Sequence, residues 1–311
     1  MPKRVCKISF LSLLDESLKV SGERFLELLN QAITLLSSER GRIWNFVVEN
    51  HLIQLDPTGE ALVIGDLHGN LESLKSILEG SGFLPKLEKQ PDACIICLGD
   101  YVDRCSESAE IFYVLLSLKL AFPKQVILLR GNHEGPKYLM AYPHDLPNQL
   151  QDRFPRGWQE IYEKMFELFD QLYLGVYVKE RYLMVHGGVS PKIHGITDLT
   201  KAKVDHQVFA DVLWSDPDED VENEAPSHRG LGVAFGKKLT KQVLEALDAK
   251  ILIRGHQAFG EGFHLNHDGR VLTLFSRTGE PYFNEAGAYL ILPLQPKFEN
   301  AEELKPFIRQ F

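Results

Sequence analysis

The chain of 311 residues is 44% hydrophobic and carries a formal net charge of −9. This length is enough to bury a large core, and the composition does not break along the chain, so we expect one domain over residues 1–311. The negative charge and the lack of a basic stripe argue against nucleic acid as a main partner. The longest apolar stretches are only strand-sized, and the amino terminus lacks a signal-type cleavage pattern. We therefore expect neither membrane insertion nor secretion and predict a cytoplasmic protein.

The first predicted element is a helix over residues 22–40, in which apolar side chains such as Phe25 and Leu29 recur at steps of three and four. The stretch over residues 43–53 contains Trp44 and Phe46, which we expect to be core side chains that pack this helix onto a sheet. The sequence therefore predicts an N-terminal helical cap over about residues 20–55. The main core is predicted over about residues 56–295.

Predicted strands and helices alternate from Glu60 onward. Three short apolar runs, at residues 60–64, 93–98 and 126–129, are typical of strands that are covered on both faces. Helical patterns over residues 71–78 and 106–121 separate them, so the sequence predicts three parallel strands joined by two helices. The later predicted elements are a helix, a hairpin, a second helix and three strands, over residues 158–172, 176–185, 239–247, 251–253, 271–275 and 288–292.

Five of the predicted strands end in glycine and in polar side chains of types that bind metals. Because the carboxyl ends of strands in α/β sheets line the ligand crevice, we expect these ends to converge, although they lie about 190 residues apart in sequence. The segments are Gly65-Asp66-Leu67-His68, Gly99-Asp100-Tyr101-Val102-Asp103-Arg104, Gly131-Asn132-His133-Glu134, His186-Gly187-Gly188 and Arg254-Gly255-His256.

The side chains at these strand ends suit a pair of divalent metal ions. Oxygen and nitrogen ligands without thiolates suit Mn²⁺, Fe or Zn²⁺, and a carboxylate between two sites can bridge two ions. Two ions about 3.5 to 4 Å apart can convert a bridging water into hydroxide for an in-line phosphoryl displacement. Arg104 and Arg229 offer planar forks that match phosphate oxygens. A lone histidine of this kind is more often structural, but six candidate ligands recur in order: Asp66, His68, Asp100, Asn132, His186 and His256.

Two other stretches have more ordinary interpretations. Residues 216–224 carry six carboxylates in nine residues, which is typical of a solvated loop. Cys94 and Cys97 have the spacing of a redox or zinc half-site, but they lie in an apolar run without a second cysteine pair. We therefore predict that both are buried structural thiols.

These strand-end motifs closely resemble, in order, those of the phosphoprotein phosphatases. This family comprises the metal-dependent protein serine/threonine phosphatases and includes protein phosphatase 1. The resemblance covers about residues 25–293. Later motifs that also fit the family are Leu213-Trp214-Ser215-Asp216-Pro217, His228-Arg229-Gly230, Arg254-Gly255-His256-Gln257 and Thr273-Leu274-Phe275-Ser276.

The resemblance implies a fold, a reaction and a role for each site residue. The fold would be the α/β calcineurin-like metallophosphoesterase fold, a central β-sandwich flanked by helices with a dimetal site at the strand carboxyl ends. The enzyme would hydrolyse phosphoserine and phosphothreonine esters in proteins. His133, oriented by Asp103, would protonate the leaving group. One ion would take Asp66, His68 and Asp100, the other would take Asp100, Asn132, His186 and His256, and the phosphate would contact Arg104, Asn132 and Arg229.

The sequence departs from the family pattern at several places. Cys105 replaces a glycine after Arg104, and residues 277–282 replace the family's Ala-Pro-Asn-Tyr-Cys, so Tyr282 is a candidate for the tyrosine that lines the site. The stretch over residues 135–156 contains four prolines and begins directly after Glu134, so we interpret it as an insertion over the site. These departures leave substrate selection and regulatory subunits unassigned.

Two alternatives to a protein phosphatase stay open at the level of the sequence. An enzyme on the same fold could cleave dinucleoside polyphosphates or another small phosphoester, and a non-catalytic scaffold could retain the fold alone. The presence of every inferred ligand argues against the scaffold. The expected cofactors are two divalent metal ions, with Mn²⁺ expected to support activity in vitro and Fe or Zn²⁺ as alternatives.

Overall fold

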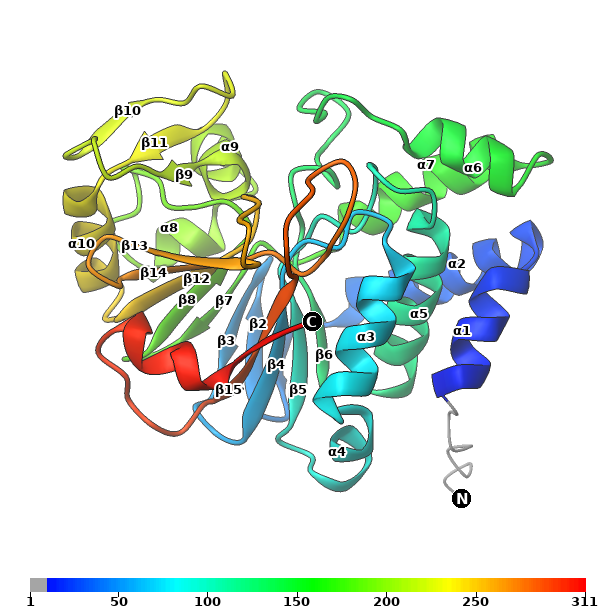
Figure 1. Cartoon of the computed structure of the whole chain (residues 1–311), viewed down its shortest axis with the longest axis horizontal. Helices are drawn as coiled ribbons and strands as arrows, with labels where there is room; N and C mark the ends of the chain where they lie inside the picture. Colours follow the sequence, from blue (N-terminus) through cyan, green and yellow to red (C-terminus); the bar gives the residue numbers. More distant parts are fainter. Residues whose placement is uncertain (1–9) are drawn as a thin grey trace.

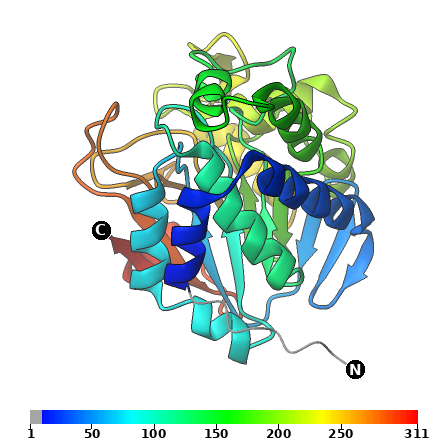
Figure 2. The same cartoon turned by 90° about the vertical axis from the view of Figure 1, so that its right-hand side faces the viewer.

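The computed structural model describes residues 10–311, and two β-sheets with helices on both outer sides dominate it (Figures 1 and 2). The five-stranded sheet has the order β16-β15-β4-β5-β6. Its strands β4, β5 and β6 are parallel. Helix α3 lies in the connection between β4 and β5, and α5 lies in the connection between β5 and β6, which confirms the predicted order of strands and helices. The bounds are β4 (Glu60–Ile64), α3 (Leu71–Ser81), β5 (Cys94–Cys97), α5 (Ser108–Ala121), β6 (Val126–Leu128), β15 (Ala288–Pro293) and β16 (Ile308–Gln310).

The second large sheet has eight strands in the order β1-β2-β3-β7-β8-β12-β14-β13. The predicted hairpin is present as antiparallel β7 and β8, and β12 runs parallel to both β8 and β14. The bounds are β1 (Gly41–Ile43), β2 (Phe46–Glu49), β3 (Leu52–Leu55), β7 (Gly175–Val178), β8 (Tyr182–Val185), β12 (Ile251–Arg254), β13 (Phe263–Asn266) and β14 (Val271–Leu274). A small third sheet joins β9 (Asp216–Pro217), β10 (Glu224–Pro226) and β11 (Val233–Phe235).

Helices cover the outer side of each sheet. Beside the five-stranded sheet lie α1 (Phe10–Lys19), α2 (Gly22–Ser38), α3, α4 (Leu84–Lys89), α5, α6 (Leu146–Arg153) and α7 (Trp158–Phe169) (Figure 1). On the far side of the eight-stranded sheet lie α8 (Ile196–Thr200), α9 (His206–Trp214) and α10 (Lys237–Ala246) (Figure 1). A 3₁₀ helix, η1 (Ala301–Phe307), precedes β16. No helix within residues 10–311 is long and apolar enough to cross a membrane.

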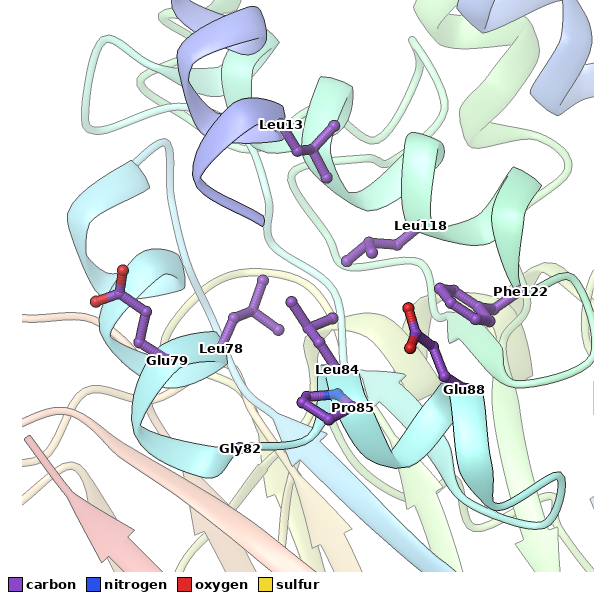
Figure 3. A pocket seen from close by; sticks show the side chains of 9 residues that line it. All are labelled: Leu13, Leu78, Glu79, Gly82, Leu84, Pro85, Glu88, Leu118 and Phe122. Carbon is purple, nitrogen blue, oxygen red and sulfur yellow. The ribbon is translucent and has the colours of Figure 1, made fainter. Parts of the chain in front are cut away.

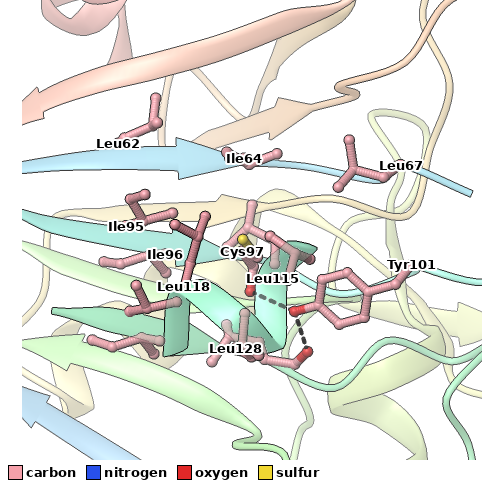
Figure 4. Packing of buried hydrophobic residues seen from close by; sticks show 14 of the residues in the cluster. Leu62, Ile64, Leu67, Ile95, Ile96, Cys97, Tyr101, Leu115, Leu118 and Leu128 are labelled. Atoms are coloured by element: carbon pink, nitrogen blue, oxygen red, sulfur yellow. Dashed lines mark hydrogen bonds between the residues drawn. The ribbon is translucent and has the colours of Figure 1, made fainter. Parts of the chain in front are cut away.

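The main core fills the space around β4, β5 and β6 (Figure 4). Leu62, Ile95 and Leu128 are fully buried, and complete burial of such a side chain contributes about 1.5 to 3 kcal/mol. The hydroxyl of buried Tyr101 donates to the carbonyl oxygens of Cys97 (3.2 Å) and Leu129 (2.8 Å). These bonds satisfy backbone acceptors where β5 and β6 end, so the core reaches up to the turns that follow both strands.

The N-terminal part is less helical than predicted. Helix α2 ends at Ser38, and residues 41–55 form β1, β2 and β3, which extend the eight-stranded sheet. The prediction that Trp44 is a core residue is wrong, because its side chain is 55% exposed. Ile43 pairs with Phe46, so Trp44 and Asn45 form a two-residue hairpin loop, and Trp44 has a positive φ of 58°. Phe46, the next aromatic residue, is fully buried as predicted.

Two further predictions concern short stretches. Cys94 and Cys97 are buried free thiols, which confirms the structural interpretation. The acidic stretch is solvated only in its later part, because Glu219 to Glu224 are mostly exposed whereas Asp216 is buried. The solvated-loop prediction is therefore wrong for Asp216, whose carboxylate forms an ion pair with the buried side chain of Arg254.

Candidate metal and phosphate site

The five predicted strand ends converge at one place. Three of them follow β4, β5 and β6 of the five-stranded sheet, and two follow β8 and β12 of the eight-stranded sheet. Their metal-type atoms form two groups, and in each group all atoms lie within 4.8 Å of one another. The first group is His68, Asp100 and His133, and the second is Asp100, His186 and His256. Asp100 belongs to both groups, which is the shared position that the sequence analysis predicted for it.

The remaining two predicted ligands lie beside these groups. Asp66 Oδ2 is 3.8 Å from His68 Nε2, and Asn132 Oδ1 is 2.9 Å from His186 Nε2. The His186 Nε2 atom is also 3.2 Å from His256 Nδ1. All six predicted ligands are therefore gathered at the junction of the two sheets, and all are buried.

The donor set fits divalent metal ions. Asp66 Oδ2 is buried without a hydrogen-bond partner among the described residues, a costly arrangement unless another group binds it. The Nδ1 atoms of His68 and His186 lie 2.9 Å and 3.1 Å from the carbonyl oxygens of Val102 and Leu98, which leaves each Nε2 directed into the site. A histidine oriented by a carbonyl through its other ring nitrogen is the usual form of a metal ligand.

The charge states of His68 and His256 agree with that fit, whereas Asp100 raises the pKa of His186. Burial lowers the pKa of His68 to about 3, and burial together with Arg229 lowers the pKa of His256 well below its usual value. Both imidazoles are therefore neutral near pH 7, as metal ligands must be. Burial and the charge of Asp100 raise the pKa of Asp66 to about 7, because two carboxylates in one buried site repel each other. A cation between them would remove that repulsion.

Several site residues occupy an unusual backbone conformation. Positive φ angles occur at His68 (43°), Asp100 (56°), Asp103 (67°), Arg104 (69°) and His256 (73°). Non-glycine residues rarely adopt this region, and such conformations concentrate at functional sites because the surrounding structure must hold them in place. The turns after β4, β5 and β12 thus direct side chains inward at some cost in stability.

One neighbouring glycine is required by the close approach of two turns. A Cβ atom on Gly131 would lie 2.2 Å from Asp100 Oδ1 and 2.3 Å from the Asp100 amide nitrogen. No side chain fits at that distance. The turn after β6 can therefore lie against the turn after β5 only because residue 131 is glycine.

Glu134 joins the same two turns and has a role that the sequence analysis did not assign. Its Oε2 accepts hydrogen bonds from the amides of Asp100 (2.8 Å) and Gly131 (3.0 Å). Its Oε1 accepts from the amides of Tyr101 (2.8 Å) and Val102 (3.2 Å). The signal in the sequence was a carboxylate directly after two site residues, Asn132 and His133. Glu134 is fully buried and holds the backbone around Asp100 in place.

The predicted acid pair is assembled beside the first ligand group. His133 Nδ1 donates to Asp103 Oδ2 at 2.6 Å, and Asp103 is fully buried. Arg104 Nη2 lies 3.3 Å from His133 Nε2, so a phosphate held by Arg104 would be next to that nitrogen. The Arg104 guanidinium also donates to the carbonyl oxygens of Pro143 (3.1 Å) and Tyr142 (3.4 Å).

Arg229, the other arginine predicted to bind phosphate, is held by a carboxylate. Arg229 pairs with Asp216 Oδ2, and its Nη2 is 3.5 Å from the carbonyl oxygen of His256. Buried Arg254 donates to the other carboxylate oxygen of Asp216 at 3.0 Å. Asp216 is thus a second residue whose role the sequence analysis missed. Its place in a motif that fits the family was the signal that could have found it.

Tyr282, the candidate for the tyrosine that lines the site, lies beside the ligand His68. Its ring stacks on that of His68 with 5.6 Å between the centroids, and it packs edge-on against Phe275 at 4.8 Å. Burial raises the pKa of Tyr282 to about 12, so its hydroxyl stays protonated near neutral pH.

A separate apolar pocket lies among helices α1, α3, α4 and α5, away from these strand ends (Figure 3). It has a volume of about 320 Å³ and contains none of the predicted site residues. Its lining consists of Leu13, Leu78, Glu79, Gly82, Leu84, Pro85, Glu88, Leu118 and Phe122.

Comparison with known proteins agrees with this geometry. Residues 60–259 match the family described as Calcineurin-like phosphoesterase, and all predicted catalytic, phosphate-binding and metal-binding residues lie in that range. The chain is 32% identical over 310 residues to "Probable serine/threonine-protein phosphatase" of Encephalitozoon cuniculi, a match that covers 97% of this chain and 65% of that protein. It is 34% identical over 219 residues to the serine/threonine-protein phosphatase 6 catalytic subunit of Caenorhabditis elegans, which covers 69% of this chain and 63% of that protein. The chain thus spans just under two thirds of the length of both relatives.

A solved structure shows the same fold. It is a protein serine/threonine phosphatase of Saccharomyces cerevisiae with similarity to human phosphatase PP5. The TM-score is 0.73 at 21% identity, over 94% of this chain and 90% of that one. The predicted fold is therefore confirmed. The family match over residues 60–259, together with these relatives, shows that the chain belongs to the calcineurin-like phosphoesterase family.

Proposed function

We propose that this protein hydrolyses phosphoserine and phosphothreonine esters in proteins, with two divalent metal ions as cofactors. The observation that carries the proposal is the double ligand group centred on Asp100, with the His133–Asp103 pair and Arg104 directly beside it. The names of the relatives, which are serine/threonine-protein phosphatases, support the choice of substrate.

We assign Asp66, His68 and Asp100 to one ion, because Asp66 Oδ2 and Asp100 Oδ2 lie 3.8 Å and 3.4 Å from His68 Nε2. The other ion would be held by Asp100, Asn132, His186 and His256. When bound, the two ions would activate a water molecule for attack on phosphorus and neutralise the charge of the phosphate. Nitrogen and oxygen ligands without thiolates suit Mn²⁺, Fe or Zn²⁺.

The protein side chains would hold the phosphate and supply a proton. Arg104 and Arg229 can form charge-assisted hydrogen bonds to its oxygens, and Asn132 would add an amide contact. Burial alone would lower the pKa of His133, but the carboxylates of Asp100 and Asp103 outweigh burial and raise it. The raised pKa favours the protonated form of His133, which can donate a proton from Nε2 to the leaving oxygen of serine or threonine.

The proposal is tested by assaying purified protein with Mn²⁺ on a phosphoserine peptide and, in parallel, on a dinucleoside tetraphosphate. We expect rapid release of phosphate from the peptide and little cleavage of the dinucleotide. Preferential cleavage of the dinucleotide would show a small-phosphoester hydrolase instead. Absence of turnover on both substrates, with both ions bound, would show a non-catalytic scaffold.

A further inference from the structure

His144 makes a second imidazole contact with the carboxylate that orients His133. Its Nδ1 lies 3.2 Å from Asp103 Oδ2, the same oxygen that accepts from His133 Nδ1. Its Nε2 lies 3.1 Å from the hydroxyl of Tyr162 on α7. The His144 side chain is only 13% exposed and packs against the rings of Tyr162 and Phe166.

The contacts of Asp103 account for all of its strong acceptor positions. Oδ1 accepts from the amides of Asp145 and Leu146, each at 2.8 Å. Oδ2 accepts from the two histidines. A carboxylate oxygen has two lone pairs, so His144 fills the acceptor position on Oδ2 that His133 leaves open. Each oxygen of the carboxylate thus has two hydrogen-bond partners, and rotation of the carboxylate would break at least one of these bonds.

The two contacts of His144, with the Asp103 carboxylate and the Tyr162 hydroxyl, together decide which ring nitrogen carries the proton. A neutral imidazole has one donor and one acceptor nitrogen, and the hydrogen bond at one nitrogen fixes the role of the other. If the Tyr162 hydroxyl donates to Nε2, the proton of neutral His144 is on Nδ1 and points at Asp103. The contact thus connects helix α7 to the acid pair through one ring.

We propose that His144 is a positioning residue that locks the Asp103 carboxylate in the plane required by His133. This inference rests on the proposed function and adds a residue from the stretch over residues 135–156, which departs from the family pattern. The same stretch also contacts Arg104, because the backbone amide of Arg104 donates to Asp145 Oδ2 at 3.2 Å. The divergent stretch therefore contacts both Asp103 of the acid pair and the guanidinium of Arg104.

The test compares His144→Ala with His144→Asn on two substrates. The amide nitrogen of asparagine is attached at the same side-chain position as Nδ1, so His144→Asn keeps a donor for Asp103. With His144→Ala we expect kcat on a phosphoserine peptide to fall about 10-fold, at the lower end of what loss of an orienting partner costs. The loss on nitrophenyl phosphate, whose leaving group needs no proton, should be much smaller, and KM should change little. His144→Asn should restore most of the activity on the peptide.

A readout that does not depend on turnover separates this proposal from the proposed function. In nuclear magnetic resonance spectra of the wild-type protein, the nitrogen shifts of His144 should show the Nδ1–H form. Tyr162→Phe should change those shifts toward a mixture of both forms. These results would support the role of His144 even if no phosphopeptide were hydrolysed.

Two outcomes would overturn the proposal. One is an equal loss on both substrates in His144→Ala with no recovery in His144→Asn, which would make His144 a packing residue. The other is a wild-type His144 that carries its proton on Nε2. His194→Ala is the matched control, because His194 is exposed and is not among the site residues. It should leave both activities and the His144 shifts unchanged.

Discussion

His133 has surroundings that fit two different roles. Its ring lies edge-on against that of His68, with 4.7 Å between the centroids, and it belongs to a possible metal group with His68 and Asp100. Its Nδ1 is nevertheless taken by Asp103 at 2.6 Å, and its Nε2 is beside Arg104. A proton donor needs Nε2 to face the leaving oxygen, so the second environment favours an acid over a ligand.

His133→Asn distinguishes these two roles. General-acid assistance is worth roughly 10² to 10⁴-fold, so we expect a loss of that size on a phosphoserine peptide and a markedly smaller loss on nitrophenyl phosphate. Metal content, measured by mass spectrometry of the purified protein, should equal that of the wild type. Loss of bound metal would assign His133 to the ligands, and equal losses on both substrates would place the proton donor elsewhere.

The turns after β5 and β6 behave as one unit because Glu134 binds both. Its two oxygens accept four amide hydrogen bonds from residues of the two turns. Burial and the neighbouring Asp100 raise the pKa of Glu134 to about 7, yet four N–H donors favour the ionised carboxylate. The position of Asp100 thus depends on a residue that touches neither phosphate nor the predicted ions.

Glu134→Gln should weaken this unit without changing its volume. The amide NH₂ of glutamine would face two backbone N–H groups that need an acceptor, and each unsatisfied donor costs about 1 to 3 kcal/mol. We expect the free energy of unfolding, measured with urea, to fall by at least about 2 kcal/mol, together with the activity. The control is Glu163→Gln, since Glu163 is in an exposed ion pair with Lys137 and should change stability by less than about 1 kcal/mol. A fully stable Glu134→Gln protein would contradict this account.

The sequence predicted the strand ends better than the segments between them. Buried runs such as 93–98 and 126–129 are recognisable because they are apolar and end in glycine, and the site residues follow directly. Helix α9 was missed, and α6 lies inside the predicted insertion. The parts played by Glu134, Asp216 and His144 depend on contacts between distant turns, which no local pattern encodes. Trp44 was placed wrongly because an aromatic residue at a hairpin tip looks in sequence like one in a core.

Both large sheets contribute residues to the proposed ligand set. Asp66, His68, Asp100 and Asn132 follow strands of the five-stranded sheet, whereas His186 and His256 follow strands of the eight-stranded sheet. Asp100 Oδ2 is 3.4 Å from His68 Nε2, and its Oδ1 is 3.3 Å from His186 Nε2, so this side chain reaches ligands from both sheets. Ions held by all six residues would link the sheets and oppose their separation.

Removal of the ions should therefore lower the melting temperature. A ligand present at about 100 times its dissociation constant stabilises the folded state by about 2.7 kcal/mol. In a chain of this size we expect chelation to lower the midpoint of thermal unfolding by roughly 5 to 10 °C and added Mn²⁺ to restore it. Asp100→Asn, which removes the shared anion, should lose most of this response.

Glu79→Gln, at an exposed residue far from the strand ends, is the control and should respond like the wild type. A melting temperature that does not depend on metal would contradict the proposed link between the sheets. So would an Asp100→Asn protein that responds fully to Mn²⁺.

The order of the strands along the chain also matters while the protein is being synthesised. Strand β4 lies between β5 and β15, but β15 is made more than two hundred residues after β4. Until the ribosome has produced residues 288–293, one edge of β4 has no strand partner, and an open edge is a template for pairing with other chains. The nascent protein therefore passes through a stage in which most of the ligands exist while their sheet is still unfinished.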